Sequence, residues 1–317
     1  MLNSPFQPMH IPDGFLSAVV SLVLWMISVP LIGYALKRVG QDLGERQVPV
    51  MGVLAAAIFA GQMLNFSVTG GTSGHLLGAA LATMLLGPWA AVVVLTTVVS
   101  IQALIFQDGG LLALGPNLFN MALVGVAVAH FVYSSIRRLA PAKPAGLFIG
   151  GVLAAWTSIV IASLACALEL VLSGTSPANL AIPAMAGIHM LIGLGEAAIT
   201  LGAIAFLYTA RHDVLQPNGA AQRGSVAVWV GGAAISAALA ILSPLASAHP
   251  DGLEWVARQQ GFLKAARHPI YQLIPDYVLP GIPNDALATI LAGIIGALLV
   301  FGTALGVAYA RRSNTNR

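Results

Sequence analysis

The stretch LFIGGVLAAWTSIVIASLACALELVL, residues 147–172, carries one charged side chain, Glu169, among apolar and small residues. The apolar core of a bilayer is about 30 Å thick and is crossed by roughly 20 helical residues, so this stretch is long enough to span it. Similar stretches recur along the whole chain. Of the 317 residues, 58% are hydrophobic and only 8% are charged, whereas soluble domains have about 25% charged residues. The composition excludes a soluble globular protein and indicates a membrane protein.

Nine apolar segments, bounded by charged residues, glycine or proline, are candidate membrane-spanning helices. They cover residues 15–36, 48–68, 76–86, 89–106, 117–136, 147–172, 182–210, 226–242 and 286–310. The third segment is short for a full span, so a tilted, broken or re-entrant helix is an alternative there. We therefore predict an all-α polytopic membrane protein with about nine transmembrane helices, a seven-helix core followed by two more.

Basic residues gather in alternate connections between these segments. They are Lys37, Arg38 and Arg46 after the first segment, Arg137, Arg138 and Lys143 after the fifth, Arg211 and Arg223 after the seventh, and Arg311, Arg312 and Arg317 after the ninth. Lysine and arginine near span ends mark the cytoplasmic side, so the pattern predicts an outside N-terminus and a cytoplasmic C-terminus. It is self-consistent only if each of the nine segments crosses once. The long connection 243–285 also contains basic residues, but long loops cross with little regard to charge.

The connector 213–224 is the polar connector that divides the chain into a seven-span part and a two-span part. We expect an extension at 1–8, a seven-helix part at 9–212, this connector as a cytoplasmic linker, and a two-helix part at 225–317. No lysine follows a glycine, so there is no phosphate-binding loop of the G-x-x-x-x-G-K-[ST] type and no ATPase in this chain. The H-E-x-x-H motif of zinc proteases is also absent.

Two histidines that this topology places toward the outer face are candidate metal ligands. A histidine directly after a free amine can chelate a divalent metal through the amine, its own deprotonated amide and its imidazole. That arrangement leaves one position for another nitrogen, and tetragonal nitrogen ligation favours Ni(II) or Cu(II). His10 follows Met9, and His75 ends the glycine-rich loop 70–75. Taken singly, each histidine is better explained as a surface or capping residue, so the hypothesis depends on the pair.

Other polar residues within or beside the segments have two interpretations each. Glu196 is an intramembrane carboxyl and a functional candidate by default, but a buried carboxyl that ties helices together explains it equally well. His189 precedes it by seven residues, which places both on one helix face about 10.5 Å apart along the axis. Asn117 and Asn120 could orient the metal ligands, or cap and bridge helices.

Five acidic residues are assigned structural roles. We expect Asp13 to be the N-cap of the first span, Asp108 to be a turn residue, and Glu169 to reach water near the outer end of its span. Asp251 and Glu254 have the spacing of a capping box and predict a short outer helix.

Five motifs, in order, resemble the CbiM/NikM family, the substrate-capture subunits of cobalt and nickel energy-coupling-factor (ECF) importers. They are MHIPDG at 9–14, GTSGHLLG at 71–78, QDGG at 107–110, GPNLFNM at 115–121 and HMLIGLGE at 189–196. The motif HPDGLEW at 249–255 resembles the start of a PDGLE (NikN-like) domain, which accompanies that subunit either fused to it or as a small separate protein.

The resemblance implies that Met9, His10 and His75 hold the metal, through the Met9 amine, the amide and ring of His10, and the ring of His75. An internal Met9 has no free amine, so we expect translation to begin at Met9. Removal of residues 1–8, or a different fourth nitrogen, are the alternatives, and mass spectrometry of the N-terminus distinguishes them. The resemblance also implies a transmembrane coupling subunit of the CbiQ/NikQ type and cytoplasmic ATPases of the CbiO/NikO type.

The expected function is that of a multi-pass subunit of the cell (inner) membrane within an ATP-driven importer. It captures Co²⁺ or Ni²⁺ from outside, for cobalamin synthesis or nickel enzymes, and the sequence does not distinguish the two ions. The ion is cargo, no catalytic cofactor is expected, and the partners are membrane lipid and protein subunits rather than nucleic acid. The alternatives are a proton-coupled secondary metal transporter that uses Glu196, a membrane enzyme, and a purely structural subunit.

Overall fold

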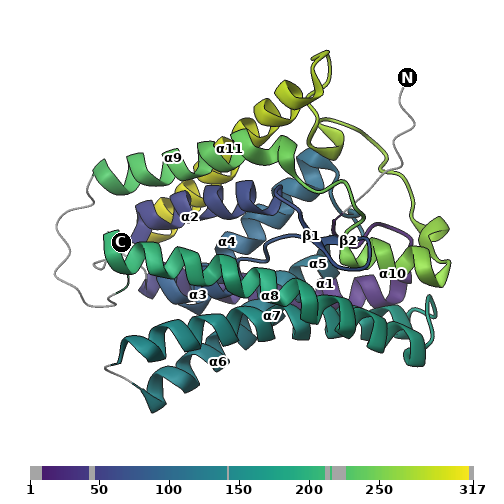
Figure 1. Ribbon diagram of the computed structural model, residues 1–317, viewed down its shortest axis with the longest axis horizontal. Helices are drawn as coiled ribbons and strands as arrows, with labels where there is room; N and C mark the ends of the chain where they lie inside the picture. Colours follow the sequence, from purple (N-terminus) through teal and green to yellow (C-terminus); the bar gives the residue numbers. More distant parts are fainter. Residues whose placement is uncertain (1–8, 43–46, 141–142, 211–214, 216–225, 314–317) are drawn as a thin grey trace.

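A computed structural model describes residues 9–42, 47–140, 143–210, 215 and 226–313, and it shows a bundle of long helices with one small sheet (Figure 1). The helices of the first part are α1 (Ala18–Asp42), α2 (Gln47–Gln62), α3 (Ala79–Leu86), α4 (Pro88–Ile101), α5 (Leu114–Asn117), α6 (Gly125–Leu139), α7 (Pro144–Leu172) and α8 (Ala178–Ala210). The π-helical turns η1 (Gln102–Phe106) and η2 (Leu118–Val124) continue α4 and α5. The last part contains α9 (Val226–Leu242), η4 (Ser243–Leu245), α10 (Gly252–Gln260), η5 (Leu263–Ala265), η6 (Pro275–Tyr277) and α11 (Asp285–Ser313).

Seven helical stretches among the described residues are long and apolar enough to cross a membrane. They are Ala18–Gln41, Pro88–Phe106, Leu114–Leu139, Pro144–Leu172, Ala178–Ala210, Val228–Leu245 and Asp285–Arg311. The chain is therefore a mostly helical, multi-pass membrane protein. The two remaining predicted segments are also helical but shorter, with 16 residues in α2 and 8 in α3. Since α3 rises only about 12 Å, it does not cross the apolar core by itself.

A sharp turn at Gly87 separates α3 from α4. Its φ of +79° lies in the left-handed region, which glycine adopts without the steric cost of a side chain. Pro88 then begins α4, where its fixed φ suits the first helical position. The turn lets α3 pack against α6 and α7, while α4 contacts α1, α2 and α11 at the centre of the bundle.

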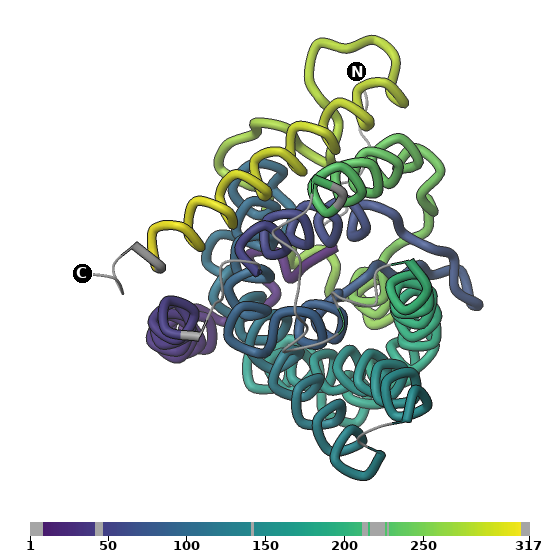
Figure 2. The backbone as a smooth tube through the Cα atoms, turned by 90° about the vertical axis from the view of Figure 1, so that its left-hand side faces the viewer, coloured from purple at the N-terminus to yellow at the C-terminus, as the bar shows by residue number. Residues whose placement is uncertain are grey.

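The helix α1 lies at the edge of the bundle, as the end-on view in Figure 2 shows in purple. Large apolar side chains of its outer face are exposed, including Val19 at 71% and Met26 at 68%. Such a continuous apolar face is stable in lipid, where the helix satisfies its own backbone hydrogen bonds.

The two last long helices, α9 and α11, pack against α2 and against each other. Glycines allow these helices to approach closely. A Cβ atom at Gly232 would lie only 1.8 Å from Val53 Cγ1, and one at Gly296 only 2.1 Å from Phe59 Cζ. Small residues at helix contacts are the usual means of packing in membranes. The C-terminal part is thus packed directly onto the first part.

A two-stranded antiparallel hairpin, β1 (Phe66–Val68) and β2 (Thr72–Gly74), follows α2. Gly70 and Gly71 turn the chain between the strands with φ of +90° and +77°. The all-α prediction is wrong in this detail, since the predicted segment 48–68 ends inside β1. Its apolar residues continue the helical pattern, and the strand forms only because β2 is available to pair with it. The hairpin contacts α8 and α10.

Candidate metal centre

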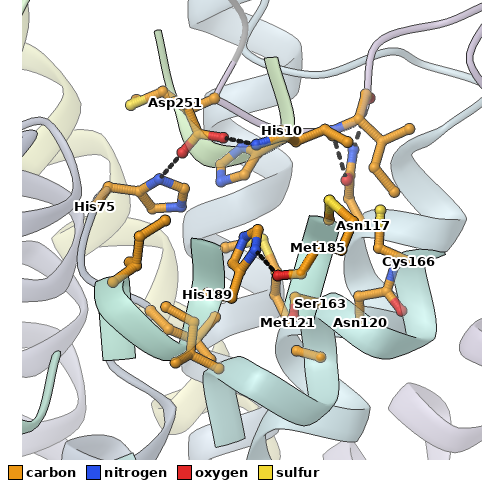
Figure 3. A pocket seen from close by; sticks show the side chains of 17 residues that line it. His10, His75, Asn117, Asn120, Met121, Ser163, Cys166, Met185, His189 and Asp251 are labelled. Atoms are coloured by element: carbon orange, nitrogen blue, oxygen red, sulfur yellow. Dashed lines mark hydrogen bonds and ion pairs between the residues drawn. The ribbon is translucent and has the colours of Figure 1, made fainter. Parts of the chain in front are cut away.

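A small cavity of about 80 Å³ lies between the N-terminal segment, the segment that follows β2, the start of α10, and the helices η2, α7 and α8 (Figure 3). Imidazoles of His10, His75 and His189 line it, together with the thioethers of Met9, Met121 and Met185. Because about 10–15 Å³ of such space is enough for one water molecule, the cavity has room for one ion together with water.

The rings of His10 and His75 meet in this cavity although they come from distant loops. Their centroids are 5.4 Å apart and their planes are nearly perpendicular, at 84°. His10 is only 4% exposed. Its Nε2 atom is buried with no hydrogen-bond partner among the described residues. The structure thus brings together the two imidazoles that the sequence pairs as ligands.

The carboxylate of Asp108 holds the N-terminal segment in place. Its Oδ1 accepts hydrogen bonds from the backbone nitrogens of Met9 (2.8 Å) and His10 (3.2 Å). The other oxygen, Oδ2, lies 3.5 Å from His10 Nδ1 and accepts a hydrogen bond from the Tyr277 hydroxyl (2.5 Å). Asp108 is therefore a buried anchor, and the expectation of a simple turn residue is wrong. It thereby holds the two nitrogens that the family resemblance implies as ligands, and the amide of His10 would have to give up this hydrogen bond in order to bind a metal.

Two further side chains fasten the residues after His10. Asn117 accepts a hydrogen bond from Ile11 N at 3.0 Å and donates one to Ile11 O at 3.1 Å. Asp13 accepts hydrogen bonds from Leu111 N (3.1 Å) and Ala113 N (2.9 Å). The expectation that Asp13 caps the first span is wrong.

Capping of α1 instead comes from Ser17, whose hydroxyl oxygen accepts a hydrogen bond from Val20 N at 3.3 Å. Asp13 is therefore available to tie the N-terminal segment to the loop before α5, across almost 100 residues of sequence.

Glu196 fixes the segment that follows His75. Its Oε2 accepts a hydrogen bond from Leu77 N (2.7 Å), and its Oε1 accepts one from Gly78 N (2.9 Å). Glu196 is fully buried and is not among the residues that line the cavity. Of its two interpretations, this geometry favours the carboxyl that ties structural elements together.

Asn120 and Glu169 form a second buried pair, between η2 and α7. Asn120 Nδ2 donates a hydrogen bond to Glu169 Oε2 at 2.9 Å, and Glu169 is only 4% exposed. The expectation that Glu169 reaches water is wrong, because η2 covers it. Asn120 lines the cavity and bridges two helices, so both of its interpretations stay open.

His189, on α8, lines the same cavity as the histidine pair. Its Nδ1 lies 2.8 Å from the carbonyl oxygen of Met185, one helical turn earlier. That contact orients the ring toward the cavity, where Figure 3 shows it below His10 and His75.

Asp251, in the C-terminal part, lies beside His75, with 3.0 Å between Asp251 Oδ2 and His75 Nδ1. Burial alone would lower the pKa of His75, but the hydrogen bond and the charge of Asp251 outweigh burial and raise that pKa above its ordinary value. Burial opposes ionisation of Asp251, yet the bond to His75 holds the pKa of this carboxyl below its usual range. Burial lowers the pKa of His10, and Asp108 opposes this only in part. Burial thus favours the neutral form of His10, which is the form that ligation requires.

Side chains alone do not complete a metal site in the part of the chain that the structure describes. No three His, Cys, Asp or Glu side chains there are placed to hold one ion. The backbone nitrogens of Met9 and His10 are further candidate ligands beside the histidine pair, although both donate hydrogen bonds to Asp108 Oδ1 in this structure. Such a nitrogen-rich set suits Ni²⁺ and related ions. The expectation about residues 1–8 falls outside the described residues.

Asp108, Tyr277 and Asp251 were not predicted from the sequence as residues that hold the candidate ligands in place. Asp108 and Asp251 stand in the motifs QDGG and HPDGLE, which is the one signal that could have pointed to them. Their contacts with Met9, His10 and His75 span 98 to 176 residues of sequence, so no local pattern reveals them.

The fold and the cavity define a multi-pass membrane protein with a small, mostly apolar pocket that three histidines line. Comparison with known families identifies it further. Residues 10–214 match the CbiM family, described as the cobalt uptake substrate-specific transmembrane region, and residues 225–313 match the PDGLE domain. The chain belongs to the CbiM family and carries a PDGLE domain in its C-terminal part.

Relatives share this arrangement over their full length. A fused NikMN protein of Archaeoglobus fulgidus is 38% identical, with 97% of this chain and 100% of the relative covered. The fused nickel transport protein NikMN of Rhodobacter capsulatus is 32% identical, with 98% and 99% covered. The crystal structure of a truncated transition metal transporter superposes with a TM-score of 0.56 and 38% identity, over 63% of this chain and 98% of that one.

Proposed function

We propose that the protein captures Ni²⁺ or Co²⁺ at the outer face of the cell membrane and passes it inward as the metal-binding subunit of an ATP-driven importer. The observation that carries this proposal is the meeting of the His10 and His75 rings, 5.4 Å apart, in one buried cavity. The names of the relatives support nickel or cobalt as the cargo. They include the nickel transport protein of Rhodobacter capsulatus and a cobalt transport protein of Geobacter sulfurreducens.

The proposed ligands are the rings of His10 and His75, the backbone nitrogen of His10, and the nitrogen of Met9 when it is a terminal amine. Asn117, Asn120 and His189 are positioning or path residues around them. The metal-capture part is residues 9–212, joined by a cytoplasmic linker, 213–224, to a PDGLE part with two spans at 225–317. The ion is substrate in this proposal, and the protein catalyses no reaction of its own.

The proposed orientation has the N-terminus outside, the C-terminus cytoplasmic, and nine crossings. In Figure 1 the hairpin and α10 lie toward one end of the bundle, and the last turns of α11 lie at the other. The last turn of α6 carries Arg137 and Arg138. These basic residues support a cytoplasmic location for the end of the bundle that lies away from the cavity. For nine crossings, α3 would cross together with its flanking residues as a broken span.

Titration of the purified full-length chain with Ni²⁺ and with Co²⁺ in a calorimeter tests the capture role. We expect saturable binding of one ion per chain for at least one of the two metals. Absence of saturable binding for both would contradict the proposal.

A proton-coupled transporter that uses Glu196 is the second candidate, and the two backbone hydrogen bonds to this carboxylate argue against it. In Glu196→Gln, one amide oxygen replaces two carboxylate oxygens, and the new NH₂ group faces a backbone N–H. We expect the free energy of unfolding to fall by about 1–3 kcal/mol. Uptake of radioactive nickel by the assembled transporter measures transport, and calorimetry measures metal affinity. We expect transport to fall by no more than affinity does.

Thr200→Val, one turn further along α8, is the matched control. Thr200 is fully buried, and its hydroxyl has no hydrogen-bond partner among the described residues, so its loss should leave stability and uptake nearly unchanged. A Glu196→Gln variant that binds metal with full affinity but transports none would instead favour proton coupling through Glu196.

A further inference from the structure

The loop before α10 lies along strand β2 and is bonded to it at several points. Pro250 O accepts hydrogen bonds from Ser73 N (2.8 Å) and from the Thr72 hydroxyl (3.0 Å). His249 O accepts one from the Ser73 hydroxyl (2.8 Å). A parallel bridge also pairs Ser73 with Asp251. The PDGLE domain is thus attached directly to the strand that precedes His75.

These bonds fix the position of Asp251, and each of its two carboxylate oxygens then contacts a different partner. Oδ1 accepts a hydrogen bond from Leu253 N at 2.9 Å and so caps α10. Oδ2 lies 3.0 Å from His75 Nδ1. Asp251 is only 6% exposed, so bulk water has little access to either oxygen. The predicted short helix with Asp251 as its N-cap is confirmed. Glu254 pairs with Arg258 instead of completing the capping box, and capping uses only one of the two Asp251 oxygens.

The contact determines which nitrogen of His75 carries the proton. An ionised carboxylate can only accept a hydrogen bond, so the shared proton lies on Nδ1. In the neutral ring, Nε2 then has a free lone pair. Figure 3 shows Asp251 on one side of the His75 ring and the cavity on the other. Carboxylates commonly orient metal-binding histidines in this way.

We propose that Asp251 is a positioning residue, through which the PDGLE domain holds His75 in the orientation and tautomer that present Nε2 to the metal ion. This inference rests on the proposed function of His10 and His75 as ligands. It gives the C-terminal domain a direct part in binding, since the metal site is complete only when loop 249–251 lies on β2.

The variant Asp251→Asn separates this role from capping. An asparagine can still cap α10 through its oxygen, but its NH₂ group then faces His75 Nδ1. To accept a hydrogen bond from this NH₂ group, Nδ1 of His75 must be unprotonated. The proton of the neutral ring then lies on Nε2, where it blocks binding of the metal. The reverse amide orientation would set NH₂ against Leu253 N–H. We expect Ni²⁺ affinity to fall about 10- to 100-fold in the full-length protein.

Nuclear magnetic resonance of the same protein labelled with ¹⁵N-histidine provides a readout that a merely structural role would not change. In the metal-free wild type, His75 should give the pattern of a ring protonated on Nδ1, and in Asp251→Asn that of a ring protonated on Nε2. The His75 signals are identified by their absence in His75→Ala. Asp251→Ser, which also caps a helix but is too short to hold Nδ1, should leave a mixture of tautomers and an intermediate affinity.

Glu254→Gln is the matched control, because Glu254 lies on the same helix and pairs with Arg258 rather than with the cavity. Its affinity and its His75 signals should match those of the wild type. Wild-type affinity together with an unchanged tautomer in Asp251→Asn, or in Asp251→Ser if the Asn variant does not fold, would overturn the inference. If His75→Ala itself binds like the wild type, the proposed function fails instead.

Discussion

Replacing His75 with alanine is expected to abolish tight binding of Ni²⁺, and replacing His10 is expected to do the same. Structural zinc sites, which also use about four protein ligands, bind their metal with about 10–16 kcal/mol, and we take the same scale here. Loss of one ligand should therefore weaken binding at least 100-fold. The measurement is calorimetric titration of each purified full-length variant with Ni²⁺. The two variants should lose affinity to a similar extent, because the rings share one cavity.

His249→Ala is the control for these variants. His249 lies two residues from Asp251, but its side chain is exposed, and only its carbonyl oxygen bonds the hairpin. Equilibrium affinity should stay that of the wild type, even if uptake by the assembled transporter slows. Unchanged affinity and stoichiometry in either His10→Ala or His75→Ala would refute the assignment of that histidine.

The second large effect concerns the energy source. Vesicles that contain this chain without partner subunits are expected to accumulate no Ni²⁺ against a gradient. The chain has no phosphate-binding loop for ATP, and the carboxyl best placed for proton coupling, Glu196, is bonded to two backbone N–H groups. Addition of a coupling subunit and its ATPases should produce concentrative uptake that requires ATP. The measurement is radioactive nickel retained on filters, with and without a protonophore.

Uptake driven by ATP should persist in the presence of the protonophore. Accumulation in vesicles that lack any ATPase, driven by an imposed pH difference, would show that the chain works as a secondary transporter. A variant that lacks His75 provides the control for metal that merely adheres to the vesicles.

The helices of this fold are predictable from the sequence because long uncharged runs have few structures available to them in lipid. Every one of the nine predicted segments contains helix. The exceptions have local causes. The segment 48–68 runs on into β1 because apolar residues continue past the end of α2, and α3 is short because Gly87 turns the chain.

The candidate site is harder to predict from the sequence than the helices are. The motifs around His10 and His75 suggest a pair of ligands, and the structure places the two rings together. The carboxylates that hold them could not be predicted, because Asp108 and Asp251 reach their partners across the fold. Asp13 illustrates the same limit. Its position before the first span is typical of a capping residue, yet its carboxylate binds the loop at 111–113.

The bonds between loop 249–251 and the hairpin also bear on the value of joining both domains in one polypeptide. Within a single chain, the loop is present near β2 at an effective concentration of about millimolar or higher, and in a fixed ratio of one to one. Were the two domains made as separate proteins, the same contact would become a bimolecular equilibrium, sensitive to dilution in the bilayer and to unequal expression.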